Sequence, residues 1–149
     1  MEEKQLDERL DKFMGWIKKN MSEISEKNKI LDSVIYVIDF SKINVVLDKN
    51  YRKKQILELL GIEVSDGYDY VNYKIQEEIF KIVRLVFDVD MKTSKYGTWY
   101  KLKDYKLEIT KPIIVGVVAY VNSYDDVDCS LTFDSSDLIS FYKARRVEE

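Results

Sequence analysis

The stretch Ile113-Ile114-Val115-Gly116-Val117-Val118-Ala119-Tyr120-Val121 decides the fold of this chain. These nine residues are far fewer than the roughly 20 that a helix needs to cross a bilayer. A run that is apolar at both odd and even positions is typical of a strand covered on both faces. We therefore expect residues 113–121 to form a central strand, with other elements packed against each side of it.

A long amphipathic helix is expected at the start of the chain, over residues 1–28. Its apolar residues recur at the three- and four-residue spacing of one helical stripe: Leu6, Leu10, Phe13, Ile17, Met21 and Ile24. Trp16 lies about 100° from the centre of this stripe, because each helical residue advances the chain by that angle. The pattern therefore leaves two interpretations of Trp16, a packing edge or an exposed contact.

Strands and helices are both expected in the middle of the chain. β-Branched and aromatic residues predict strands over 34–40 and 43–47, followed by a helix over about 50–60 that Gly61 ends. The turn-like residues 65–67 precede a second helix over about 69–81. From Val83 to Met91 every second residue is apolar, and this period of two predicts a strand.

The apolar phase changes within residues 98–110. Tyr100 and Leu102 occupy even positions, whereas Leu107 occupies an odd one. A tight hairpin that turns at Lys103-Asp104 would bring these residues to one face, and a β-bulge within a single strand is the alternative. In either arrangement Trp99 lies on the opposite face.

A last strand over residues 130–133 and a helix after Asp134 complete the expected elements. We therefore predict one α+β domain over residues 1–149, with three to four helices packed on a mixed, mainly antiparallel sheet of five to six strands. The chain is 46% hydrophobic, with a net charge of −3, as in a mildly acidic globular protein. Since no secretory signal or membrane-spanning run is visible, we expect a cytoplasmic protein outside the membrane.

The composition excludes several kinds of active site. The chain has no histidine, one cysteine and five scattered glycines. These counts exclude histidine-dependent triads, cysteine-rich metal centres, an internal disulfide and a glycine-rich phosphate loop. The one cysteine, Cys129, lies among strand residues and is interpreted as a small buried side chain rather than a nucleophile. We accordingly expect no cofactor and no enzymatic activity.

One catalytic alternative comes from Asp88-Val89-Asp90-Met91-Lys92, at the end of a predicted strand. This spacing resembles the second half of the PD-(D/E)xK nuclease motif, in which carboxylates hold a divalent cation. The same carboxylate-x-lysine spacing also occurs elsewhere in the chain, and no Pro-Asp element precedes it. Aspartates on a solvated strand face are the plainer interpretation, and a metal-dependent nuclease centred on Asp88 and Asp90 is the second alternative function.

An acidic segment is the first candidate for contact with a partner. Asp125, Asp126 and Asp128 lie between Lys111 and Lys143, where the chain has no basic residue. The glycine and closing glutamate of a calcium loop are absent, so a solvated loop is the plain interpretation. Such an acidic surface suits a basic partner, including a nucleic-acid-binding protein.

An aromatic segment is the second candidate. Lysines and aromatic residues alternate over residues 92–111, and Tyr96, Trp99 and Tyr100 are expected to contact the partner. Direct binding of nucleic acid is not expected, because the net charge of the whole chain is negative. The opposing interpretation is that the eleven tyrosines mostly fill the core.

These patterns predict a non-catalytic protein-binding module that occludes a macromolecular partner through the two segments and Trp16. The chain favours residues with AT-rich codons, which indicates a low-GC bacterium, a phage or another mobile element. An inhibitor or antidote is the kind of protein expected from such a source. The first alternative is a structural or assembly subunit of a virion or other oligomer, so self-association is left open.

Overall fold

A computed structural model describes residues 2–64 and 69–134 of the 149-residue chain. The elements in chain order are α1 (Glu2–Ser25), β1 (Lys29–Ile38), the 3₁₀ turn η1 (Phe40–Lys42), β2 (Asn50–Tyr51), α2 (Lys53–Leu59), α3 (Tyr70–Val86), β3 (Phe87–Ser94), β4 (Gly97–Tyr105), β5 (Ile113–Val121) and β6 (Val127–Phe133). The strands form two antiparallel sheets. Sheet A has the order β1-β5-β6, and sheet B has the order β2-β4-β3.

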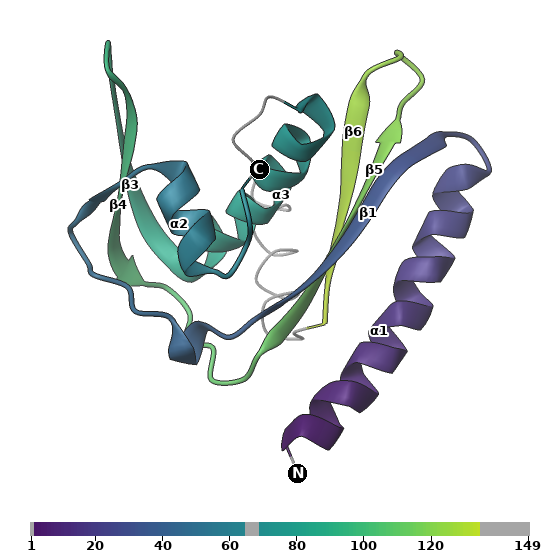
Figure 1. Ribbon diagram of the computed structural model, residues 1–149, viewed down its shortest axis with the longest axis horizontal. Coiled ribbons are helices and arrows are strands. Elements are labelled where there is room, and N and C mark those ends of the chain that lie inside the picture. The colour runs from purple at the N-terminus through teal and green to yellow at the C-terminus, as the bar shows by residue number, and fades with distance from the viewer. Residues whose placement is uncertain (1, 65–68, 135–149) are drawn as a thin grey trace.

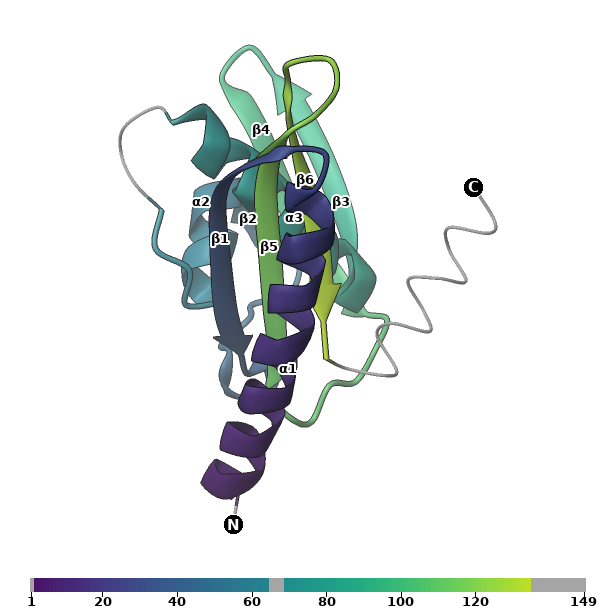
Figure 2. The same ribbon diagram turned by 90° about the vertical axis from the view of Figure 1, so that its right-hand side faces the viewer.

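Helix α3 lies between the two sheets. Helix α1 covers one face of sheet A, and α3 packs on the opposite face with α2 and sheet B beyond it (Figure 1). The view turned by 90° shows α1 running along β5 (Figure 2). The result is an α+β architecture of alternating helical and sheet layers.

Strand β5 is central and covered on both faces, as its sequence predicts. Ile114 and Val118 pack with Phe13 of α1 in one apolar cluster. Val115 and Val117 belong to the larger core that α3 shares with both sheets. These four β5 residues are fully buried. Apolar side chains on both faces are what allow one strand to join two cores.

The amphipathic helix at the start of the chain is confirmed, with an earlier end than expected. Helix α1 stops at Ser25, and β1 begins at Lys29 rather than at residue 34. The strand starts earlier because β5 offers it a partner as far as Val121, which lies opposite Lys29. A bulge at Leu31 interrupts this register.

The strand expected over residues 43–47 is wrong. The strand that follows β1 is β2, and its residues Asn50 and Tyr51 pair with β4. Val46 is 55% exposed, so its β-branched side chain has no sheet to cover it. β-Propensity describes how well a side chain fits a paired surface, and it does not create the partner strand.

The strand expected from Val83 onward is also wrong over its first four residues. Helix α3 continues to Val86, and β3 begins at Phe87. Ile79, Ile82, Val83 and Val86 are fully buried, and their spacing is that of one helical face. Val83 and Leu85 also fit the period of two that continues through β3, so the pattern alone did not separate helix from strand.

Strand β4 is continuous, so the hairpin expected at Lys103-Asp104 is wrong and the bulge is confirmed. Asp88 lies opposite Asp104 and Val89 opposite Leu102, which leaves one extra residue in β4. That extra residue shifts the apolar phase by one position. The hairpin turns instead at Lys95-Tyr96, before Gly97 with its φ of 114°.

The prediction of one mixed, mainly antiparallel sheet of five to six strands is wrong, both in the size of the sheet and in the pairing of its strands. The six strands are divided between two sheets, because α3 presents apolar residues to sheet A and to sheet B at once. Three α-helices are found in residues 2–64 and 69–134. The turn expected at 65–67 and the helix expected after Asp134 lie outside the described residues. The last expected strand is present as β6 and begins three residues earlier, at Val127.

None of the helices in the described ranges combines the length and the apolar composition that a bilayer crossing requires.

Candidate protein-binding surface

Two hairpin tips and the first turn of α3 project from the same end of the molecule. The tip between β3 and β4 and the tip between β5 and β6 both lie there in two perpendicular views (Figures 1 and 2). These tips carry Tyr96, Asp125 and Asp126, three of the seven residues that the sequence assigns to partner contact.

The β3–β4 tip presents Tyr96. Its ring is 75% exposed, and its backbone N–H donates to the Ser94 hydroxyl at 3.2 Å. The Nζ atom of Lys95 lies 5.1 Å from the centre of the ring. Tyr96 is therefore placed as expected, on a short turn that extends away from the core.

Trp99 is half-buried beneath an arginine that sequence reasoning did not assign to the site. The guanidinium carbon of Arg52 lies 3.8 Å from the centre of the Trp99 ring. The same group donates to the backbone carbonyls of Tyr96 at 2.9 Å and of Thr98 at 3.2 Å. Arg52 thus covers Trp99 and joins the start of α2 to the β3–β4 tip.

Tyr100 faces the core and does not belong to the surface. Its side chain is 7% exposed, and its ring centre lies 5.0 Å from that of Phe80. Neighbouring residues of a strand point to opposite faces, so Trp99 and Tyr100 cannot both face a partner. We therefore remove Tyr100 from the expected contact residues.

The β5–β6 tip is a turn organised by Asn122. Its side-chain oxygen accepts from the backbone N–H groups of Tyr124 at 2.9 Å and of Asp126 at 3.1 Å. Two backbone bonds, Asn122 N–H to the Asp126 carbonyl and Asp125 N–H to the Asn122 carbonyl, close the turn. Asp125 adopts a φ of 60°, a conformation that Asp and Asn tolerate better than most residues.

This turn presents Tyr124, a residue that the sequence interpretation missed. Its side chain is 89% exposed, the highest value among the large hydrophobic residues with described surroundings. The polar run Asn122-Ser123 between two apolar strands was the available signal, because such runs mark turns and so expose their neighbours.

The three aspartates of the acidic segment differ in their roles. Asp125 is exposed. Asp126 accepts from the Val127 N–H at 2.8 Å, and Asp128 accepts from the Cys129 N–H at 2.9 Å. Two of the three carboxylates are thus already engaged with the strand backbone.

Helix α3 joins the β5–β6 tip through Tyr70. Its hydroxyl group lies 3.1 Å from a carboxylate oxygen of Asp126, to which it donates. Tyr70 and Tyr73 stack with ring centres 6.5 Å apart and planes 19° apart. Together with Tyr124 and Asp125 they form one surface, which we call the acidic–aromatic end.

Trp16 belongs to α1, the helix that covers the face of sheet A opposite α3 (Figure 1). Its ring is 45% exposed and meets Phe13 edge-on, with the centres 6.4 Å apart. The Nζ atom of Lys12 lies 5.4 Å from the ring centre. Both expectations for Trp16 hold in part, because one edge packs and the rest is exposed.

The residues of the nuclease alternative lie on the edge strand β3. Asp88 is opposite Asp104 and Asp90 is opposite Lys101, and both aspartates are exposed. Within residues 2–64 and 69–134, no group of three or more acidic or cysteine side chains is placed to hold a metal ion.

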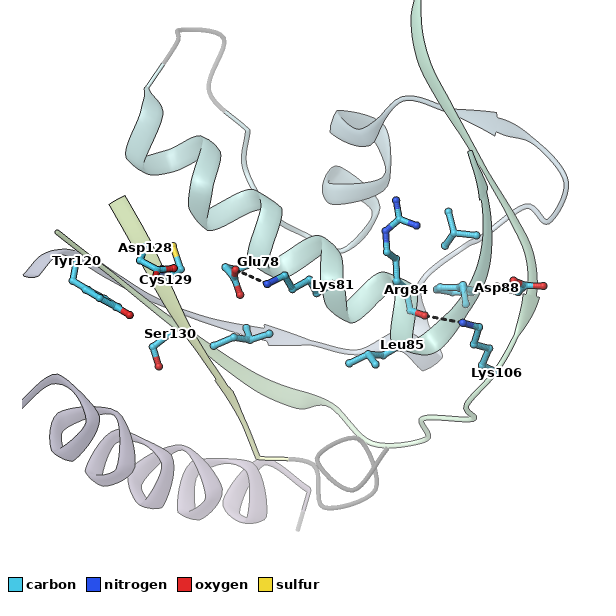
Figure 3. A pocket seen from close by; sticks show the side chains of 13 residues that line it. Glu78, Lys81, Arg84, Leu85, Asp88, Lys106, Tyr120, Asp128, Cys129 and Ser130 are labelled. Atoms are coloured by element: carbon cyan, nitrogen blue, oxygen red, sulfur yellow. Dashed lines mark hydrogen bonds and ion pairs between the residues drawn. The ribbon is translucent and has the colours of Figure 1, made fainter. Parts of the chain in front are cut away.

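A groove of about 890 Å³ runs between α3 and the outer side of β6. Figure 3 shows Asp128 and Cys129 at one end, and Arg84 and Lys106 at the other. Burial, with a smaller contribution from the Glu78 carboxylate, raises the pKa of the Cys129 thiol to about 11. The thiol is therefore protonated near neutral pH, where it is a poor nucleophile.

Comparison of the chain with protein-family models, with curated proteins and with solved structures found no match. Function is therefore inferred from the surface itself.

Proposed function

We propose that this chain is a non-catalytic protein-binding module, of the inhibitor or antidote kind, that occludes a macromolecular partner in the cytoplasm. The observation that carries the proposal is the Tyr124 ring, 89% exposed on a turn that four hydrogen bonds hold in place. A phage or mobile-element source remains part of the proposal, because the chain favours amino acids that have AT-rich codons.

A rigid turn with an exposed aromatic ring is well suited to anchor a complex. Tyrosine offers a large contact area with few rotatable bonds, and ordered loops lose little entropy on association. The Asn122 side chain already holds the turn, so Tyr124 binds without further ordering of its backbone. Tyr70 and Tyr73 extend the aromatic area beside it.

The charge of the acidic–aromatic end favours a basic partner. Asp125 is exposed beside Tyr124, and the chain has no basic residue between Lys111 and Lys143. Lys74, whose Nζ atom lies 6.0 Å from the Tyr70 ring centre, is a nearby cation that already contacts this aromatic area. Opposite charges across an interface mainly speed association and select the partner.

The variant Tyr124→Ala tests the proposal. Loss of a central aromatic anchor typically costs about 2 kcal/mol, or roughly 30-fold in affinity. Tagged wild type and variant would be used to capture proteins from host lysate, with nuclease added, and the captured partner titrated afterwards.

The proposal leaves Trp16 outside the contact surface, because it belongs to α1, which covers the face of sheet A opposite α3 (Figure 1). Trp16→Ala, which removes a partly exposed aromatic residue, is therefore the matched control. We expect it to capture the same partner with unchanged affinity. Equal affinity of wild type and Tyr124→Ala would instead refute the acidic–aromatic end as the contact surface.

An assembly subunit is the second candidate, and the exposed part of Trp16 favours it. Trp16 is 45% exposed although one edge of its ring packs on Phe13, so it is accessible to a neighbouring copy. A stable wild-type oligomer that Trp16→Ala dissociates would support this candidate, as measured by sedimentation.

A further inference from the structure

Strand β6 has an open edge. Its one strand partner among the described residues is β5, and its other side borders the groove in Figure 3. The groove, of about 890 Å³, is lined on β6 by Asp128, Cys129, Ser130 and Leu131, so this part of the strand borders open space. Such an edge is a ready template for another chain.

The two N–H groups at the start of this edge are capped by aspartates. Odd-numbered residues of β6 direct their backbone groups away from β5, because the even-numbered Asp134 N–H bonds to Ile114 of β5. On the outward side, Val127 N–H donates to Asp126 and Cys129 N–H donates to Asp128, at 2.8 and 2.9 Å. An incoming strand needs these same donors.

Among the described residues, β6 carries no other feature that discourages edge pairing. Lysine and proline are the usual residues that discourage edge pairing, and β6 contains neither. The other edge of sheet A also has a capped N–H, that of Ser33, bonded to Asp32 at 2.8 Å. It differs from β6 because a bulge at Leu31 interrupts β1 and because β1 begins with a lysine, Lys29. Strand β6 is thus the more regular of the two open edges.

We propose that Asp126 and Asp128 keep β6 from pairing with β6 of a second copy of this chain. Antiparallel pairing centred on Ser130 places Cys129 opposite Leu131 of the other copy, with both directing their backbone groups outward. Asp128 then lies opposite Thr132, and no like charges face each other within Val127–Phe133. One position beyond the strand, Asp126 lies opposite Asp134, whose carboxylate is already paired with Arg9 at 2.8 Å. The product is one continuous six-stranded sheet across a two-fold axis.

The double variant Asp126→Ala/Asp128→Ala tests the proposal by light scattering after size-exclusion chromatography. It is expected to form a dimer at concentrations where wild type is a monomer. Asp125→Ala, which removes a neighbouring carboxylate that caps no strand N–H, is expected to stay monomeric. Tyr70→Phe controls for the bond that Asp126 also makes to Tyr70.

The double variant Asp126→Asn/Asp128→Asn separates capping from charge, because asparagine keeps an acceptor oxygen. It is expected to remain monomeric. Dimers of the asparagine variant would show that charge repulsion closes the edge and would overturn the proposal, as would dimers of the wild type through β6.

A cysteine pair tests the register, since Cys129 is the only cysteine of the chain. In the alanine background, Leu131→Cys is expected to give a covalent dimer on oxidation by glutathione disulfide, whereas Thr132→Cys is not. Opposed residues of paired strands lie within the Cα separation that a disulfide spans. A monomeric alanine variant with native circular dichroism would refute the proposal. If that variant unfolds, Asp128→Ala alone with Leu131→Cys gives the same test.

Discussion

Arg52 replaces a missing strand at the β3–β4 tip. Strand β2 pairs with β4 only at Lys101 and Tyr100, so the edge of β4 beyond Tyr100 has no strand partner there. The Arg52 guanidinium occupies this edge through its bonds to two carbonyls, and it stacks on Trp99. The Arg52 side chain therefore donates hydrogen bonds to the strand edge and shields the Trp99 ring from solvent.

Arg52→Lys is expected to weaken the tip. Lysine keeps the charge, but it lacks the planar fork that bonds two carbonyls while stacking on a ring. One hydrogen bond and the stacking together amount to about 1–2 kcal/mol. Urea unfolding followed by Trp99 fluorescence, in a Trp16→Phe background, measures the loss. Lys18→Ala, which removes an exposed lysine of α1, serves as control, and equal midpoints for Arg52→Lys and wild type would contradict this account.

At the scale of elements, the strongest sequence patterns were the reliable ones. The stripe of α1 and the doubly apolar run of β5 extend over enough residues to identify each element. Residues 83–86 fit two periods at once, and only packing on both sheets selects the helix. The turn at Lys95-Tyr96 was missed because the extra residue Lys103 shifted the phase of β4 and suggested a turn in the wrong place.

The candidate surface was less predictable than the fold, because exposure depends on tertiary neighbours. Tyr96 and Asp125 are exposed as expected, whereas Tyr100 is buried and Trp99 lies under Arg52. An arginine located 47 positions before Trp99 leaves no local pattern that would reveal the contact. Tyr124 lies among polar residues and belongs to no apolar pattern, so the sequence analysis did not single it out.

Two glycines provide a matched test of how α1 packs on sheet A. A Cβ atom at Gly116 of β5 would lie 2.6 Å from the Ile17 side chain and 3.0 Å from Phe13. Gly116→Ala should therefore push α1 away and cost about 1–3 kcal/mol. A Cβ atom at Gly15 of α1 would meet no atom within 4 Å, so Gly15→Ala should stabilise the helix by about 1 kcal/mol. Urea midpoints that move in the same direction for both variants would refute this packing.

At the scale of the whole molecule, α3 lies between the two sheets and packs against both of them. Its buried face belongs to a core that includes Val117 of sheet A and Leu102 of sheet B. Neither sheet can lose α3 without exposing apolar surface, which favours a single cooperative unfolding transition.

The two tryptophans report on the two halves separately. Trp16 lies on α1 beside sheet A, and Trp99 lies in sheet B. Variants Trp16→Phe and Trp99→Phe each leave one reporter, and the fluorescence midpoint of each should coincide with the circular dichroism midpoint of the same protein. Distinct transitions from the two probes would show that the sheets unfold independently.

The order of the strands has a consequence for synthesis on the ribosome. Strand β1 pairs with β5, and Ile38 lies opposite Ile113, so all of sheet B is translated between the two partners. The β3–β4 hairpin has short-range contacts and is expected to form while β1 still has none, because contacts distant in sequence form slowly. A nascent chain that has emerged only to β4 therefore carries β1 as an apolar strand without its partner. We expect the risk of aggregation, and the need for chaperones, to be greatest at this chain length.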